Sequence, residues 1–259
     1  MIAVLRGRAG VRRRLGDAVL ALLLAVLAVL APSYLAPPAL ASESFSLRDP
    51  FSRETVRPGA VDTDPYHIAH VYEVQRRLQR LGLFRATPNG RFGPATTAAV
   101  RAFQRRNGLR ATGIVDQRTW RPLIRQSVRG RSAVPRACRS AGWHACYDRS
   151  WHQVNLYRDG TMLNSWLVRG GAASTPTLTG TYRVYWRHID HVSTIFDDAP
   201  MPYAQFFHGG QALHGSRLMM DPYVGHSHGC VNFWTEDAQQ LWALTSSRTL
   251  WVHVYGHWS

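Results

Sequence analysis

The spacing of apolar residues changes its period near the middle of this 259-residue chain. Between residues 66 and 126 the apolar side chains recur at the spacing of one helix face. From about Trp151 to residue 256 they alternate instead with polar residues, as in strands with one buried face. The sequence therefore predicts two domains: a small all-α module of three helices, then a mainly-β domain with one or two helices.

Turn-forming residues mark the limits of the expected helices. The first helix begins near Ile68 and stops before Gly82, and the second spans Ala95–Asn107 behind Pro94. The third is short, and its apolar residues are Trp120, Leu123 and Ile124.

A short internal repeat supports this division. The pattern Gly-x-apolar-x-x-x-Thr occurs at residues 90–96 and again at 113–119, and each copy leads into a helix. In the β domain we expect one helix near Thr235–Leu244, with the Thr235 hydroxyl capping its first turn.

The first 41 residues have the features of an export signal. Five arginines precede an apolar run of 14 residues, Ala18–Ala31, and Ala39-Leu40-Ala41 offers a cleavage site between small residues. An uncleaved N-terminal anchor is the alternative, because the run is only slightly too short to span a membrane. In either case we expect an exported protein in the periplasm or cell wall.

Two segments without a sustained period separate the expected parts. Residues 42–65 and 127–147 are interpreted as linkers. The helical module then occupies residues 66–126 and the β domain residues 148–259.

Basic residues are concentrated in the helical module. Between Arg76 and Arg139 the sequence has 16 arginines and one acid, Asp116, whereas residues 140–259 are close to neutral. Such a block attracts polyanions, and export argues against nucleic acid. Three alternatives stay open: anionic lipid as partner, an anionic wall polymer as partner, or a solvated arginine-rich surface with no dedicated partner.

Three cysteines in an exported chain predict one disulfide and one free thiol. Cys138 and Cys146 enclose seven residues of a loop-rich stretch, so we expect them to pair and to leave Cys230 free.

Histidines surround the free thiol in the sequence. His226 and His228 closely precede Cys230, and His214 lies sixteen residues before it. An imidazole can take the proton of a thiol that attacks a carbonyl group, and the N–H groups of Gly229 and Cys230 can face the resulting oxyanion. Two other interpretations stay open: a zinc site of His214, His226, His228 and Cys230, and a buried structural cysteine.

A run of turn glycines and core residues is characteristic of the helical module. It comprises Val74-Gln75-x-x-Leu78-x-x-Leu81-Gly82, Asn89-Gly90-x-Phe92-Gly93-Pro94-x-Thr96, Ala99-Val100-x-x-Phe103-Gln104, Gly108-Leu109, Gly113-x-Val115 and Thr119-Trp120. Over residues 66–126 this run resembles the peptidoglycan-binding domain type 1. The resemblance implies attachment to the glycopeptide of the cell wall.

The residues around Cys230 carry a second resemblance. They comprise His214-Gly215-Ser216 and Ser227-His228-Gly229-Cys230-Val231-Asn232, with Thr175-Pro176-Thr177-x-Thr179-Gly180-Thr181-Tyr182 and Met201-Pro202-Tyr203 upstream. Residues 148–256 thereby resemble the L,D-transpeptidase catalytic domain, the YkuD-like family. Leu178 departs from the family pattern, because it is an extra residue in what is more often a tight Pro-x-Gly turn.

The resemblance implies a role for each residue of this block. Cys230 would be the acylated nucleophile and His214 the base that takes its proton, with the backbone carbonyl of Gly210 orienting the imidazole. The other implied roles are pocket walls from Ser227 and His228, oxyanion N–H groups from Gly229 and Cys230, a loop brace from Asn232, and further pocket contacts from Gly215, Ser216, Met201 and Tyr203.

The implied reaction is acyl transfer that needs no metal or organic cofactor. Cys230 would attack a tetrapeptide stem, release the terminal D-Ala and pass the thioester to the amine of a neighbouring stem, which makes a 3→3 cross-link in peptidoglycan. Water as the acceptor would make the same site an L,D-carboxypeptidase. The remaining alternatives are a zinc-dependent peptidoglycan peptidase and a noncatalytic wall-binding protein. Carbapenem β-lactams are the expected covalent inhibitors.

Overall fold

The computed structural model describes residues 46–258, apart from residues 48, 65–66, 131–132 and 197. The expected export signal or anchor at residues 1–41 lies outside the described residues. Within the described part of the chain, none of the helices combines the length and apolar character that a membrane span requires. The described residues all belong to one compact unit.

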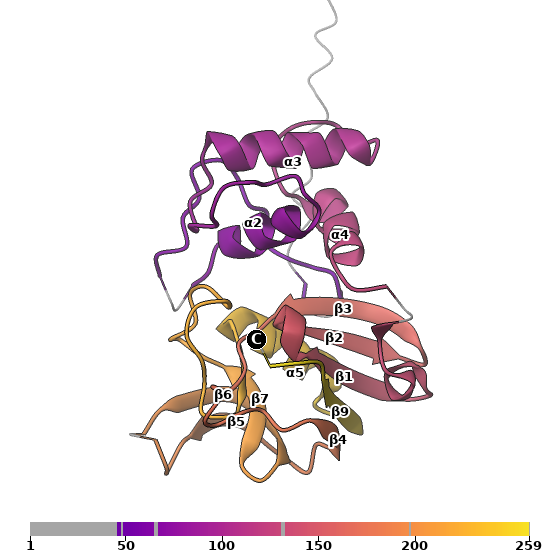
Figure 1. Cartoon of the computed structure of the whole chain (residues 1–259), viewed down its shortest axis with the longest axis vertical. Helices are drawn as coiled ribbons and strands as arrows, with labels where there is room; N and C mark the ends of the chain where they lie inside the picture. The colour runs from indigo at the N-terminus through magenta and orange to yellow at the C-terminus, as the bar shows by residue number, and fades with distance from the viewer. Residues whose placement is uncertain (1–45, 48, 65–66, 131–132, 197, 259) are drawn as a thin grey trace, which may run out of the picture. The chain divides into compact units, whose positions relative to one another are not determined.

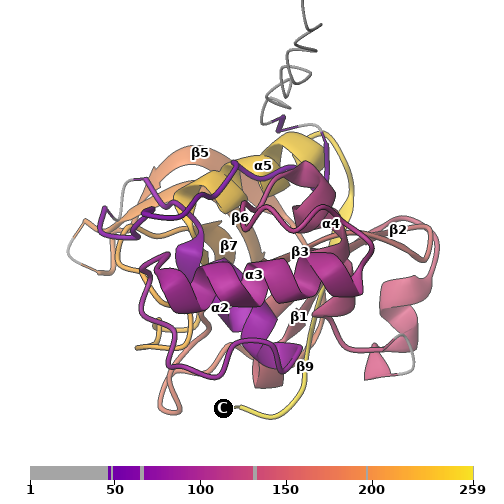
Figure 2. The same ribbon diagram turned by 90° about the horizontal axis from the view of Figure 1, so that it is seen from above.

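Three helices form the first folded part, as expected: α2 Val71–Arg80, α3 Pro94–Arg106 and α4 Gln117–Gln126 (Figure 1). Pro94 occupies the first turn of α3, where its missing N–H leaves no helical hydrogen bond unmade. Asp116 caps α4 by accepting the backbone N–H of Thr119 at 2.9 Å. Seen from above, α3 lies across α2 (Figure 2).

The core of this module includes side chains from the segment before α2. Phe51 and Val56, which lie in the expected linker at residues 42–65, are buried. They pack in one cluster with Val71, Val74, Leu78, Phe84, Phe92, Ala99, Val100, Phe103, Val115, Trp120, Leu123 and Ile124. The segment around Phe51 and Val56 therefore packs against the helices and does not extend away from them.

Two glutamines brace the repeated turns in the same way. The side chain of Gln75 on α2 accepts the N–H of Gly90 and donates to the hydroxyl of Thr96, both at 3.0 Å. Gln104 on α3 accepts the N–H of Gly113 at 2.9 Å and donates to the threonine hydroxyl of the second copy at 3.1 Å. Gly90 and Gly113 have φ values of +67° and +78°, which side chains rarely adopt, so glycine is needed at both turns.

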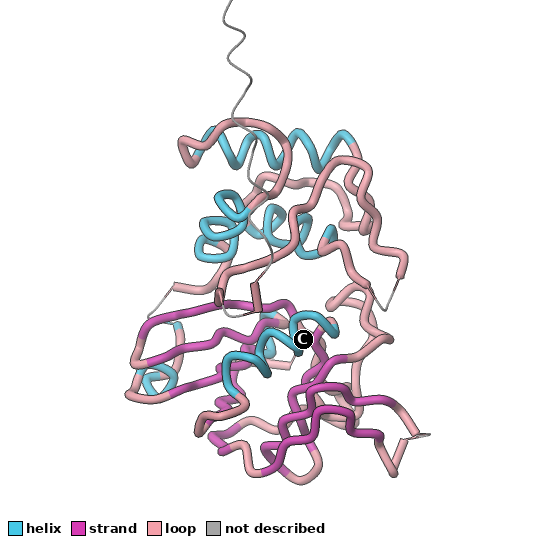
Figure 3. Tube along the Cα trace, turned by 180° about the vertical axis from the view of Figure 1, so that it is seen from behind, coloured by secondary structure: helices cyan, strands magenta, loops and turns pink. Residues whose placement is uncertain are grey.

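Two β-sheets, with one further α-helix, form the second folded part (Figure 3). One has the strand order β3-β2-β1-β9-β4 and the other β5-β6-β7-β8. The strands are β1 Trp143–Asp148, β2 Gln153–Arg158, β3 Thr161–Leu167, β4 Gly180–Arg183, β5 Trp186–Val192, β6 Pro200–His208, β7 Gln211–Gly215, β8 Val231–Phe233 and β9 Leu250–Tyr255.

The first strand begins earlier than the sequence suggested. Trp143, the first residue of β1, lies inside the segment expected as a linker. Two short 3₁₀ helices flank β1, namely η2 Arg136–Arg139 and η3 Arg149–Trp151. The expected disulfide between Cys138 and Cys146 is present and ties η2 to β1.

One apolar core combines both sheets with the helix α5, Thr235–Thr245. It includes Trp166 and Val252 from the first sheet, Leu213 from the second, and Leu241 from α5. The helix therefore packs in the same core as both sheets.

The expected cap of α5 is wrong. Thr235 is the first residue of the helix, and Trp234 is the N-cap, without a side-chain capping bond. A capping residue needs a non-helical backbone, which Thr235 does not have. Glu236 and Asp237 do lie in the first turn, where a carboxylate suits the helix dipole.

A buried ion network joins the segment before α2 and α2 itself to the β domain. Arg53, only 1% exposed, lies 3.3 Å from the carboxylate of Glu73 and 2.9 Å from the side-chain oxygen of Gln240 on α5. Arg77, which is fully buried, donates to Glu73 at 2.8 Å and to the carbonyl of Ser165 on β3 at 2.7 Å. Glu73 is thus the anion shared by two buried guanidinium groups.

Candidate active site

Two neighbouring strands carry the expected nucleophile and base. β7 and β8 pair in parallel, with Leu213 opposite Val231 and His214 opposite Asn232. Side chains alternate along a strand, and Leu213 and Val231 face the main core, so His214 lies on the other face. Cys230, directly before β8, shares that other face, because it packs against the separate cluster of Met201, Ala204, Phe206 and Ala212. The fold thus places Cys230 and His214 on one face, at diagonal positions of adjacent strands.

The tautomer of His214 follows from one hydrogen bond. Its Nδ1 lies 2.7 Å from the carbonyl oxygen of Gly215. Because a carbonyl oxygen only accepts, Nδ1 carries the proton and Nε2 keeps a lone pair, which is the form a base requires. Burial lowers the pKa of the His214 imidazole to about 4, so the ring is neutral at pH 7.

The expected role of Gly210 as the orienting carbonyl is therefore wrong. Gly210 belongs to the turn before β7, four residues from His214, and such a separation spans roughly 13 Å along a strand. Gly215 directly follows His214, so its carbonyl is within reach of the ring.

The Cys230 thiol is half-buried, and its Sγ donates to the carbonyl oxygen of Gly210 at 3.8 Å. Burial raises the pKa of the thiol above its ordinary value, and the backbone N–H of Ala212 only partly opposes this effect. The thiol is therefore protonated at pH 7. Since His214 is neutral as well, the pair rests without charge, and proton transfer must accompany an attack by sulfur.

Ser227 holds the turn that leads to Cys230. Its hydroxyl donates to the carbonyl of Cys230 at 2.5 Å and accepts the N–H of Gly229 at 3.1 Å. Gly229 has a φ of +118°, and a Cβ there would lie 2.7 Å from the side chain of Gln211. The N–H of Gly229 can reach an oxyanion only when Ser227 releases it.

Gln211 makes contacts that the sequence analysis missed. Its Nε2 donates to the carbonyl of Pro176 at 3.0 Å, and its Oε1 accepts the N–H of Leu178 at 3.1 Å. This clamp holds the loop with the extra residue and leaves the Leu178 side chain 44% exposed. Nothing in the sequence distinguishes Gln211 from an ordinary surface glutamine.

A close backbone approach beside the turn was also missed. A Cβ on Gly171 would lie only 2.9 Å from the Cα of Gly229 and would meet the carbonyl oxygen of Thr175. The N–H of Gly171 donates to the hydroxyl of Thr177 at 3.0 Å. The doubled glycine at residues 170–171 is the sequence signal that could have found this contact.

The other two histidines of the block point to different neighbours. The ring of His228 stacks on Phe196 with centroids 4.5 Å apart, and the ring of His226 lies 5.3 Å from that of Trp258. Among the described residues, there are clusters of three or more His, Cys, Asp or Glu residues whose possible metal-ligand atoms lie within 4.8 Å of one another. Neither His226 nor His228 belongs to any of these clusters of described residues. The structure thus does not gather the four residues of the zinc alternative.

Three further expected pocket residues belong to the framework of the site. A Cβ on Gly215 would lie 3.1 Å from both Pro202 and Thr235, so this glycine permits close packing there. Ser216 is buried, and its N–H donates to the last carbonyl of β8 at 2.9 Å. Asn232 is buried beside His214, as its position on the paired strand requires.

Met201 and Tyr203 of β6 are placed differently from each other. Met201 is buried in the apolar cluster that Cys230 contacts. Tyr203 is half-buried against the main core and has a φ of +59°, which a tyrosine rarely adopts. The strand therefore has a strained backbone at Tyr203, close to the residues that support Cys230.

Comparison with protein families divides the chain at the same place as the fold does. Residues 69–123 match the family model of a peptidoglycan binding domain. Residues 143–254 match that of the L,D-transpeptidase catalytic domain. Among curated proteins, none matches the chain.

Several L,D-transpeptidases of known structure are similar to this chain. One from Stackebrandtia nassauensis is 23% identical with a TM-score of 0.49, over 78% of this chain and 95% of that one. One from Xylanimonas cellulosilytica is 26% identical with a TM-score of 0.46, over 79% and 98%. L,D-transpeptidase 3 from Mycobacterium tuberculosis, in complex with a faropenem-derived adduct, is 20% identical with a TM-score of 0.38, over 44% and 60%.

Proposed function

We propose that this chain, which carries an L,D-transpeptidase catalytic domain behind a peptidoglycan binding domain, is an exported enzyme that joins peptidoglycan stems by 3→3 cross-links. One observation carries the proposal: Cys230 and His214 share one face of adjacent strands, and the bond to Gly215 leaves the lone pair of His214 on Nε2. A neutral thiol beside a neutral imidazole base suits acyl transfer through a thioester.

The first half-reaction uses these two side chains together. The thiol proton moves to Nε2 of His214 as Sγ of Cys230 bonds to the carbonyl carbon of the L,D-peptide bond. The tetrahedral intermediate then collapses: the C–N bond breaks, the imidazolium returns its proton to the departing amine of D-Ala, and a thioester remains on Cys230.

The second half-reaction runs in the opposite sense. The amine of a neighbouring diamino acid attacks the thioester, His214 takes a proton from that amine, and the C–S bond breaks. The imidazolium then reprotonates Cys230. In both halves the N–H groups of Cys230 and Gly229 would stabilise the oxyanion, once the Ser227 hydroxyl turns away from Gly229.

Two other activities define the alternatives. An L,D-carboxypeptidase would use the same thioester with water as the acceptor. A zinc-dependent peptidase is less well supported, since His228 stacks on Phe196, His226 lies beside Trp258, and neither histidine converges with His214 and Cys230.

The proposal is tested with the purified protein and a tetrapeptide muropeptide, followed by intact mass. We expect muropeptide dimers with the loss of one D-Ala per dimer, at the same rate with and without a metal chelator. Hydrolysed tripeptide as the main product would indicate the carboxypeptidase. Activity that a chelator removes and zinc restores would contradict the thioester route.

The arginines of the helical module fall into two sets with different surroundings. Those of α2 face the β domain, where Arg76 pairs with Asp221 at 2.5 Å and Arg77 is fully buried. The second set is exposed and consists of Arg85, Arg91, Arg101, Arg105, Arg106, Arg110, Arg118, Arg121 and Arg125. We propose that this exposed set attracts anionic wall polymers in addition to the glycopeptide.

Salt should therefore weaken the binding of the full chain to sacculi. Exposed charges are screened over about 8 Å at physiological ionic strength. We expect binding to fall at least about tenfold between about 50 and 200 mM salt; six to ten phosphate contacts would lose roughly 10³- to 10⁵-fold over that range. The measurement is a pull-down with intact and polymer-stripped sacculi across a salt series. Binding that is insensitive to salt with both preparations would exclude the electrostatic contribution.

A further inference from the structure

A sulfur–histidine cluster lies on the sheet that does not carry Cys230. In the parallel pair β1 and β9, Cys146 is opposite His253, and Cys138 reaches the same place from η2 through the disulfide. The two Sγ atoms and one ring nitrogen of His253 all lie within 4.8 Å of one another. All three residues are buried.

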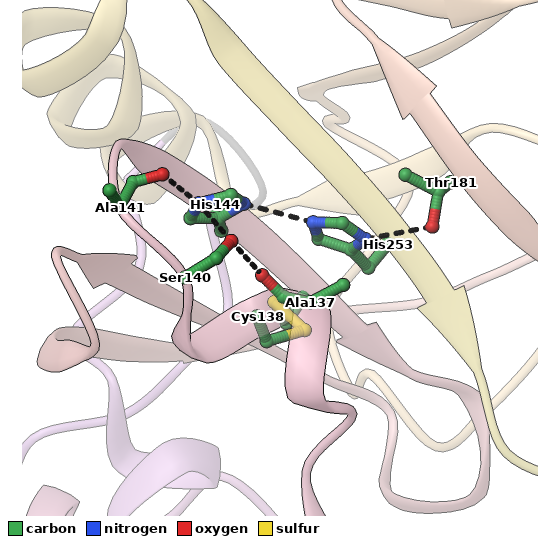
Figure 4. Close-up of a disulfide and its surroundings, with 8 residues drawn as sticks. Ala137, Cys138, Ser140, Ala141, His144, Thr181 and His253 are labelled. Carbon is green, nitrogen blue, oxygen red and sulfur yellow. Dashed lines mark hydrogen bonds between the residues drawn. A yellow bond between two sulfur atoms is a disulfide. The ribbon is translucent and has the colours of Figure 1, made fainter.

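Hydrogen bonds hold His253 in one orientation. Its Nδ1 bonds to the hydroxyl of Thr181 and its Nε2 to Nδ1 of His144, both at 2.9 Å (Figure 4). Nε2 of His144 lies 2.9 Å from the carbonyl of Ala141, which only accepts, so this nitrogen carries the proton. When both rings are neutral, these hydrogen bonds can run in only one direction: Thr181 donates to His253, and His253 donates to His144.

We propose that the dithiol form of this cluster is a zinc site, with the thiolates of Cys138 and Cys146 and one ring nitrogen of His253 as ligands. A water molecule completes the four-coordinate geometry that zinc prefers. Tetrahedral zinc bonds of about 2.3 Å to sulfur and 2.0 Å to nitrogen place the ligand atoms about 3.5–3.8 Å apart. The two sulfur atoms, which are bonded to each other in the disulfide, must separate to about that distance after reduction. Two thiolates also balance the charge of the ion, which suits a buried site.

The surroundings of His253 meet a further requirement of zinc binding. A metal-bound imidazole needs a hydrogen-bond partner at its other nitrogen, which fixes the ring and its tautomer. If Nδ1 binds the metal, Nε2–H donates to His144. If Nε2 binds it, Nδ1–H donates to the Thr181 hydroxyl. In both cases the ring nitrogen that binds zinc must first give up the hydrogen bond that it makes in the disulfide form.

The disulfide and zinc states exclude each other. A dithiol reductant delivers two electrons and two protons to the disulfide, becomes a disulfide itself and leaves two thiols on the protein. Zinc binding then releases both thiol protons. Because Cys138 lies on η2 and Cys146 on β1, η2 stays attached to the sheet in both states.

A second buried cluster of possible metal ligands differs from the sulfur–histidine cluster because it already contains a positive charge. His70, Glu73 and Asp237 also have donor atoms within 4.8 Å of one another. There Arg53 lies 3.3 Å from Glu73 and 3.5 Å from Asp237, so a guanidinium already supplies the positive charge. The disulfide is neutral, but after reduction two thiolates at Cys138 and Cys146 would carry negative charge that a cation neutralises, which is why we assign the metal to this cluster.

The test uses the full chain with Cys230→Ser, so that Cys138 and Cys146 are the remaining thiols. The protein is reduced with a phosphine and titrated with Co²⁺ as a spectroscopic probe. We expect about one equivalent to bind, with thiolate-to-cobalt charge-transfer and tetrahedral d–d absorption that zinc abolishes. The disulfide form of the same protein is the matched control and should show neither. His253→Gln should weaken binding at least about tenfold.

Several outcomes would overturn the zinc site. One is a reduced, folded protein that shows no charge-transfer band with Co²⁺. Another is a His253→Gln variant that binds Co²⁺ with unchanged affinity. A charge-transfer band that persists after complete unfolding in guanidinium would show that the two cysteines bind the metal without the fold. A reduced chain that unfolds and is not refolded by zinc would also contradict the zinc site. None of these results depends on the proposed function, because Cys230→Ser removes the proposed nucleophile.

Discussion

Cys230→Ala is expected to abolish muropeptide dimer formation, with a loss of roughly 10⁴-fold or more in rate. The variant keeps the fold, because Cys230 is only half-buried and contributes one side chain at the edge of an apolar cluster. It removes the atom that forms the thioester, and the His214 base then has no thiol to deprotonate. The measurement is dimer formation by intact mass, as for the unaltered protein.

The controls for this result use the other properties of the same variant. Cys230→Ala should bind sacculi like the unaltered chain, since the helical module is unchanged. A carbapenem should add its mass to the unaltered protein and not to the variant, because the strained β-lactam carbonyl is open to attack by the Cys230 sulfur. Dimers formed at a near-normal rate by Cys230→Ala would refute the assignment, and near-normal acylation in His214→Ala would move the role of base to His228.

Glu73→Gln should lower the free energy of unfolding by about 3–5 kcal/mol, the cost of breaking a buried ion pair from one side. The change leaves the guanidinium groups of Arg53 and Arg77 buried without their anion. Chemical denaturation of both proteins measures the difference. Glu54→Gln is the matched control, because the Glu54 side chain is 43% exposed and its loss should change stability by less than about 1 kcal/mol. Equal stabilities for the two variants would mean that the network contributes little.

The same carboxylate predicts how stability depends on pH. Burial alone would raise the pKa of Glu73, but Arg53 and Arg77 lower it to about 2. A group whose pKa is depressed by folding stabilises the protein above its unfolded value of about 4.3 and loses that contribution as the pH falls toward about 2. The difference in stability between the unaltered protein and Glu73→Gln should therefore shrink as the pH falls from 5 toward about 2.

The predicted parts of the fold depend on local signals. The stop at Gly82 and the start at Pro94 each act within a few residues, and the structure confirms the helices that they delimit. Both family resemblances, carried by short runs of consecutive residues, are likewise confirmed by the matching family models.

The parts that sequence could not predict depend on contacts between distant residues. Arg53 and Arg77 look like the other arginines of a basic block, and only the fold brings them to Gln240 and Ser165. In the candidate site, the choice of Gly215 to hold His214 depends on the ring's rotamer, which no spacing reveals. Cys230 and His214 stay predictions as catalytic residues until the variants are measured.

The two glutamine braces of the helical module bear on the order in which the chain folds. They join residues between 9 and 21 positions apart, whereas the contact between His144 and His253 spans 109 positions and that between Arg53 and Gln240 spans 187. Closing a long loop costs more entropy and slows the search for the native contact. A newly made chain should therefore complete its helices early, align β1 with β9 later, and bury Arg53 as one of its last steps.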